Sequence, residues 1–217
     1  MLDRAALKQS AKDKLKGKWG TAVLIAFIFF LINGAFSALG NIKETGFIFS
    51  LASIFISAPL TFGMTLAFLV LVKSDSLVFE NLFSGFKFYP RSLGMYLWTS
   101  LWVLLWALLF IVPGIIKAIA YSQVFFIIAD NPEVRVRDAM KISMRMTEGH
   151  KGDLFVLGLS FMGWALLSLL ALGVGFLWLV PYYQTTMANT YLKLREMSLQ
   201  NGACTEDMFS GKRTLVQ

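Results

Sequence analysis

The sequence predicts an all-α membrane protein with six transmembrane helices, and three observations support this. The chain has 217 residues, of which 57% are hydrophobic and only 15% are charged, whereas about a quarter of the residues in a soluble domain are charged. Its mean hydropathy is +0.65. Apolar runs of about bilayer-spanning length, roughly 17 to 25 helical residues, recur along the chain. They cover residues 19–39, 47–72, 94–112, 113–129, 154–171 and 174–192.

The basic residues predict how the chain is oriented. Of the 20 Lys and Arg, 18 lie before residue 19, at 73–91, at 135–151 or from residue 193 onward. The connections at 40–45, 112–114 and 172–175 carry only Lys43. Because Lys and Arg are enriched in cytoplasmic loops, we predict that both termini and the two long loops are cytoplasmic.

The lengths of the connections predict three helical hairpins. Short outer turns alternate with long inner loops, which places the hairpins at about 19–72, 94–129 and 154–192. We expect residues 1–197 to form one integral membrane domain. The segment 198–217 is polar and rich in small residues, so we expect it to be disordered.

A polar stretch with helical periodicity precedes each hairpin. In the first stretch Leu7, Ala11 and Leu15 recur every four residues, which is typical of a helix that lies in the membrane interface. The stretches before the second and third hairpins carry similar apolar stripes. We expect three amphipathic cytoplasmic helices, either as linkers packed under the bundle or as surfaces that bind anionic headgroups or a partner. The basic residues of these surfaces are Lys8, Lys12, Lys16, Arg137, Lys141 and Arg145.

The last two hairpins resemble each other. Gly114, Tyr121 and Gln123 recur 61 residues later as Gly175, Tyr182 and Gln184, which indicates an internal duplication. Lys117 lies between the first two of these positions, about one helical turn after the proline turn. We expect it to reach the outer headgroups, with a contact to the Tyr121 ring, or to bind a ligand there.

A polar stripe lies within the last apolar run. Tyr182, Thr186 and Asn189 are spaced four and three residues apart, so they share one helix face. In hydrocarbon such side chains need polar partners, which leaves interhelical hydrogen bonds or a polar cavity. The residues of the cavity or of the interhelical contacts are Lys117, Tyr121, Gln123, Tyr182, Gln184, Thr186 and Asn189. The expected helix breaks are Pro59, Pro113, Gly114 and Gly175.

The composition argues against several classes of function. Apart from the run ends, the apolar runs contain no Asp, Glu or His, and the sole histidine, His150, and sole cysteine, Cys204, lie outside them. A zinc or di-metal hydrolase needs a set of such ligands. We therefore expect no enzyme activity, no metal and no cofactor. The clustering of basic residues in the inner loops argues against a nucleic-acid partner.

Several sequence blocks resemble a known family. They include "FENLFSGFKFY", "LLFIVPGIIKAIAYSQ", "ADNP", "GHKGDLF" and "GFLWLVPYYQTTMANTYL". Together they resemble an uncharacterised family of bacterial integral membrane proteins, the nine-seven-five family of domains of unknown function. The resemblance covers about residues 2–194. More distantly, the pattern of helices is similar to the membrane portion of some glycerophosphodiester phosphodiesterases. It implies a multi-pass protein of the bacterial cell membrane.

These observations favour a non-enzymatic membrane module that binds lipid, a peptide or a partner. Its expected partners are membrane lipids with anionic headgroups, another membrane protein or a second copy of itself. The alternative is a small-solute or lipid transporter with a polar cavity between the hairpins.

Overall fold

The computed structural model describes residues 2–40, 42 and 46–211, and every regular element in these ranges is helical. The amino-terminal half contains α1 (Arg4–Leu15), α2 (Trp19–Gly40), α3 (Gly46–Ser74), the short 3₁₀ helix η1 (Phe79–Phe83), α4 (Ser84–Lys87) and α5 (Tyr89–Leu109). The carboxy-terminal half contains α6 (Ile111–Ala120), α7 (Val124–Asp130), α8 (Val136–Thr147), α9 (Lys151–Leu170), α10 (Phe176–Gln200) and α11 (Glu206–Phe209). The all-α prediction is confirmed for this part of the chain.

Four stretches of the described residues are long and apolar enough to cross a membrane. They are Trp19–Gly40, Gly46–Ser74, Val112–Asp130 and Lys151–Leu170. Four of the six expected crossings are therefore matched by suitable helices. The crossings expected at 94–112 and 174–192, and the orientation of the termini, stay predictions.

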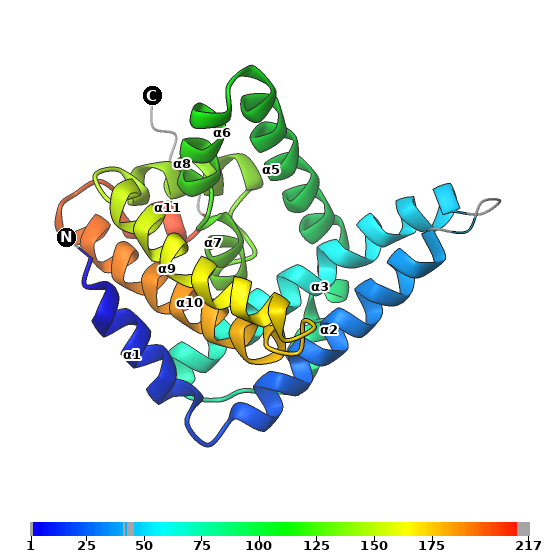
Figure 1. Ribbon diagram of the computed structural model, residues 1–217. Helices are drawn as coiled ribbons and strands as arrows, with labels where there is room; N and C mark the ends of the chain where they lie inside the picture. Colours follow the sequence, from blue (N-terminus) through cyan, green and yellow to red (C-terminus); the bar gives the residue numbers. More distant parts are fainter. Residues whose placement is uncertain (1, 41, 43–45, 212–217) are drawn as a thin grey trace.

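Neighbouring helices pair along much of their length (Figure 1). α2 lies beside α3, and α5 lies beside α6. The two pairs extend in different directions from a common centre. α10 runs through that centre and packs against α1, α2 and α3. The buried apolar residues gather where the second half of α3, α7, α8 and the second half of α10 meet. The outer parts of α2, α5 and α9 expose large apolar side chains instead, as helices facing lipid do.

The first helix begins with a side-chain cap. The Asp3 carboxylate accepts hydrogen bonds from the backbone N–H groups of Ala5 and Ala6, each at 3.0 Å, and so satisfies two amides that a helix start leaves without partners. The predicted apolar stripe of Leu7, Ala11 and Leu15 is buried. α1 is therefore fixed to the core along one face.

The expected helix breaks differ from the structure at two prolines. Pro59 lies inside α3, which continues from Gly46 to Ser74, because a helix tolerates the single lost hydrogen bond where neighbours pack closely. The turn expected at 112–114 comes earlier, at Phe110, and Pro113 falls in the first turn of α6. A proline is acceptable there because the amides of a first turn have no intrahelical partner. Gly175 does mark a boundary, as the residue before α10.

Glycines allow close backbone approaches at two of the turns. A Cβ at Gly114 would lie 2.8 Å from the Ala107 Cα, and a Cβ at Gly175 would lie 2.6 Å from the Ser168 Oγ. Ala107 and Ser168 are themselves 61 residues apart, the same offset as the two glycines. The two close approaches occur at the same offset, and the duplication of the hairpins stays a prediction.

The segment after residue 198 differs from the expected disordered tail. α10 continues to Gln200, and Cys204 and Phe209 are buried, Phe209 being 5% exposed. The Asn131 side-chain amide donates a hydrogen bond of 2.8 Å to the Phe209 carbonyl oxygen. Two buried anchors in a polar segment are enough to fold it against the core as far as residue 211. Residues 212–217 of the expected tail lie outside the described residues.

We predict that Gly114→Ala lowers the stability of the protein by about 1–3 kcal/mol, the usual cost of forcing an extra methyl group into a packed contact. The matched control is Gly163→Ala on α9, where an added Cβ meets no atom within 4 Å and helix propensity favours alanine. Thermal unfolding of both variants in detergent measures the difference. Equal midpoints for the two variants would contradict the close approach.

Candidate functional site

Lys117 projects from α6 into a set of protein contacts. Its Nζ lies 5.0 Å from the Trp106 ring centroid, 6.0 Å from that of Tyr121 and 4.0 Å from the Met144 sulfur on α8. The expected contact with Tyr121 is therefore present. The expected reach toward outer headgroups stays a prediction; the half-buried Lys117 contacts two aromatic faces and α8 in the structure.

A break separates α6 from α7 at residues 121–123, and one serine of α8 bridges it. The Ser143 hydroxyl donates a hydrogen bond of 2.6 Å to the Ala120 carbonyl and accepts one of 3.3 Å from the Gln123 backbone N–H. The bridge satisfies backbone groups that a helix break would leave unpaired in a buried place. Tyr121 and Gln123 are both buried at this point, and the Gln123 side-chain amide donates to the Ser122 hydroxyl at 3.0 Å.

The polar stripe of α10 contacts other helices. The Tyr182 ring packs edge-on against Phe161 of α9 at 5.3 Å, and the Thr186 hydroxyl donates to the Tyr182 carbonyl at 2.8 Å. The Asn189 amide donates to the Leu7 carbonyl of α1 at 3.5 Å. The Tyr182 and Asn189 contacts fit the interhelical interpretation of the stripe, whereas the Thr186 hydrogen bond stays within α10.

The seven predicted polar residues thus form two separate groups. Lys117, Tyr121 and Gln123 contact α5 and α8, whereas the α10 residues contact α1, α3 and α9; Gln184 approaches the Met64 sulfur of α3 at 3.7 Å. None of the seven lines either of the two cavities described below. A cavity shared by both groups stays a prediction without a supporting contact in the described part of the chain.

The sequence reasoning missed a buried carboxylate that joins three helices. Asp130, at the end of α7, pairs with Lys73 from the end of α3. It also accepts a hydrogen bond of 2.9 Å from the Tyr191 hydroxyl and lies 3.5 Å from the Arg195 guanidinium, both on α10. Arg195 in turn pairs with Glu206 at 2.7 Å. The "ADNP" block that begins at residue 129 was the one signal in the sequence that included this residue.

Basic side chains lie on the outward faces of α1 and α8. Lys12, Lys16, Arg137, Lys141 and Arg145 are exposed, and Lys8 is partly buried. Some of them also cover aromatic rings: the Arg137 guanidinium lies 5.0 Å from the Trp98 ring and the Lys12 Nζ lies 5.7 Å from that of Tyr182. We call the six residues, Lys8, Lys12, Lys16, Arg137, Lys141 and Arg145, the basic surface.

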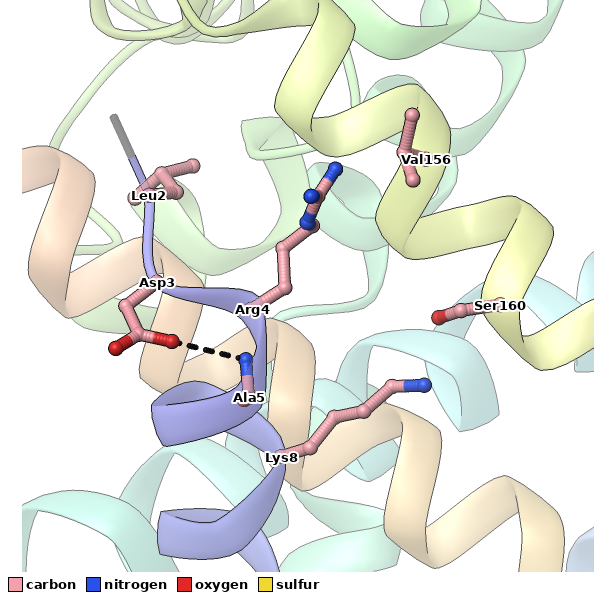
Figure 2. A pocket seen from close by; sticks show the side chains of 7 residues that line it. All are labelled: Leu2, Asp3, Arg4, Ala5, Lys8, Val156 and Ser160. Atoms are coloured by element: carbon pink, nitrogen blue, oxygen red, sulfur yellow. Dashed lines mark hydrogen bonds between the residues drawn. The ribbon is translucent and has the colours of Figure 1, made fainter.

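A cavity of about 630 Å³ opens between the start of α1 and α9 (Figure 2). A second cavity of about 540 Å³ adjoins it and shares Arg4 and Val156. The first cavity is lined by Leu2, Asp3, Arg4, Ala5, Lys8, Val156 and Ser160. Within the described ranges, no three His, Cys, Asp or Glu side chains are grouped as metal ligands would be.

In the part of the chain that the structure describes, an all-helical fold with four apolar stretches long enough to cross a bilayer is that of a helical membrane protein. The chain belongs to the family described as a protein of unknown function (DUF975), whose model matches residues 1–120 and 111–198. The resemblance noted in the sequence is thereby confirmed. No curated protein and no solved structure matches the chain, and the distant similarity to glycerophosphodiester phosphodiesterases stays a prediction.

We predict that Asp130→Asn destabilises the protein by about 1–3 kcal/mol, because it removes the charge that Lys73 and Arg195 share and weakens a buried hydrogen bond. Lys73 and Arg195 are partly exposed, which keeps the loss below that of a fully buried ion pair. A denaturant titration in detergent micelles measures it.

The control for this prediction is Asp138→Asn, which removes the exposed pair between Arg135 and Asp138 on α8. Exposed pairs contribute at most about 1 kcal/mol. If the two variants lose the same stability, Asp130 does not join the helices as described.

Proposed function

We propose that this protein is a non-enzymatic, multi-pass protein of the bacterial cell membrane that binds anionic phospholipids through the basic surface at its cytoplasmic side. One observation supports this above the others. α1 and α8 each bury an apolar stripe against the core while their Lys and Arg side chains point outward. Because the apolar stripes pack inside the protein, the outward Lys and Arg side chains are available to attract anionic headgroups.

The size of the basic surface makes the electrostatic attraction considerable. Each Lys or Arg near an anionic leaflet contributes about 1 kcal/mol, and the attraction falls off within a Debye length. Each of the two helices carries one acidic residue, Asp13 on α1 and Asp138 on α8. Asp138 is already paired with Arg135 at 2.9 Å, so the net field of α8 is positive.

The contacts support lipid binding more than a solute pathway. A pathway between the hairpins would need Lys117, Gln123 and Asn189 around one space. In the structure Lys117 contacts α5 and α8, Asn189 contacts α1, and Gln123 is fully buried with its side-chain amide on Ser122. The polar residues of the spans therefore hold helices together, and the free charges lie on the surface.

The experiment that tests this function measures which lipids stay with the protein. The full chain is extracted in a mild neutral detergent, and the ratio of anionic to zwitterionic phospholipid that copurifies is compared with that of the source membrane. We expect a clear enrichment of anionic lipid that decreases as salt is raised. We expect Lys12→Glu/Lys16→Glu/Lys141→Glu/Arg145→Glu to abolish the enrichment.

The matched control is Lys193→Glu, which changes an exposed lysine outside the basic surface that pairs with Glu196 at 2.9 Å. This variant should retain the enrichment. A wild-type ratio equal to that of the source membrane would refute the proposed function.

A further inference from the structure

The cavity between α1 and α9 has two cations at its mouth. Arg4 and Lys8 are one helical turn apart, so both project from the same face of α1, and Figure 2 shows both side chains extending toward α9, where Val156 and Ser160 lie. Within residues 2–40, 42 and 46–211, no carboxylate lies in ion-pair distance of either cation. Neither positive charge at the cavity is therefore held in an ion pair by a described carboxylate.

The carboxylates near the cavity already have protein partners. Asp3 accepts the hydrogen bonds from the Ala5 and Ala6 amides, and its carboxylate points away from α9 (Figure 2). Asp153 accepts a hydrogen bond of 3.0 Å from the Leu2 backbone N–H and lies 3.7 Å from the His150 Nδ1. Asp153 lines the adjoining cavity together with Arg4, whose charge acts on it electrostatically. Neither carboxylate forms an ion pair with Arg4 or Lys8 among the described residues, so an added anion can still bind between the two cations.

The opposite wall of the cavity is apolar. Val156 is 42% exposed, and Phe155 and Leu159 beside it on α9 are exposed to a similar extent. The Lys8 Nζ lies 4.3 Å from the Phe161 ring centroid, so its ammonium group is partly desolvated. That burial, and secondarily the charge of Lys12, lowers the pKa of Lys8. An anion bound beside Lys8 would reverse this effect, because an opposite charge favours the protonated form.

We propose that this cavity is a specific site for one anionic phospholipid, whose phosphate binds between Arg4 and Lys8 and whose acyl chains lie along Val156 and the exposed apolar face of α9. The Ser160 hydroxyl at the cavity wall donates to the Leu157 carbonyl oxygen, so towards the headgroup it can accept a hydrogen bond from a glycerol hydroxyl. The volume of about 630 Å³ falls in the range of small-molecule sites, roughly 300–1,000 Å³. The proposal rests on the proposed function, since it assigns one defined site within a protein that binds anionic lipid.

The test titrates short-chain lipids against the full chain in a neutral detergent and counts bound molecules by native mass spectrometry. Three probes are compared. Dioctanoyl phosphatidylglycerol is anionic, dioctanoyl phosphatidylcholine has the same chains with a zwitterionic headgroup, and glycerol phosphate carries the anion without the chains. We expect one saturable phosphatidylglycerol molecule per chain, and markedly weaker binding of the other two probes.

Two variants and one control locate the site. Arg4→Gln/Lys8→Gln should weaken phosphatidylglycerol binding about tenfold for each cation removed, as expected for lost charge-assisted contacts. Ser160→Trp leaves both charges in place and fills the cavity, so it should also abolish the saturable molecule. The control Lys87→Gln/Lys193→Gln removes the same charge from two exposed lysines outside both the cavity and the basic surface, and it should bind as the wild type does. Unchanged circular dichroism of each variant confirms that α1 is still folded.

The outcomes separate this site from the general function. If anionic lipid is enriched on the purified protein but Arg4→Gln/Lys8→Gln binds as tightly as the control, the site is refuted and the basic surface is retained. If glycerol phosphate binds as tightly as the lipid, the ligand is a free phosphate compound and the lipid site is refuted. If no anionic lipid is enriched at all, the proposed function itself fails.

Discussion

Hydrocarbon offers no hydrogen bonds, and this constraint accounts for where the chain places its polar groups. A backbone group left unpaired in a bilayer costs several kcal/mol. Where the backbone of α6 stops being helical, the Ser143 hydroxyl satisfies both sides of the break. Where charges lie at the helix ends, Asp130 draws Lys73 and Arg195 into one cluster. The outer surfaces of α2 and α9 are left to apolar side chains.

The same constraint favours close packing between backbones. A Cβ at Gly63 in α3 would clash with the backbone of Leu82 in η1, and a Cβ at Gly85 in α4 would clash with the backbone of Pro59. Small residues permit such approaches, and helix association in membranes depends on them because lipid supplies little hydrophobic driving force between helices. The short segment before the second hairpin is thereby fixed against the middle of α3.

Much of the fold could be predicted from the sequence because it depends on local patterns. Apolar runs determined the helices of the four candidate spans, and a four-residue spacing identified the buried face of α1. Long-range contacts could not be predicted in this way. Lys73, Asp130 and Tyr191 are separated by 57 and 61 residues, so nothing local indicates that they meet. The direction of Lys117 depends on Trp106 and Met144, which a snorkelling argument does not include.

The candidate site also combines residues that local sequence patterns identify with contacts that they do not. The basic residues of α1 and α8 follow from periodicity, but the cavity does not, because it depends on how α1 packs against α9. Arg4 was not among the predicted basic residues; its importance follows from the contact of Leu2 with Asp153, which brings the start of α1 to the start of α9. The folded segment at 201–211 likewise depends on two anchors, Cys204 and Phe209, within an otherwise polar sequence.

In the proposed orientation, the basic surface and the turn after α9 lie on opposite sides of the membrane. Cys204 is the sole cysteine, so single cysteines can be introduced in a Cys204→Ser background. Leu172, 94% exposed in that turn, and Lys141, exposed on α8, are the positions to compare with a membrane-impermeant maleimide on intact cells. If α8 is cytoplasmic and the turn after α9 is outside, Leu172→Cys is labelled directly and Lys141→Cys only after the membrane is permeabilised. Direct labelling of Lys141→Cys in intact cells would contradict this orientation.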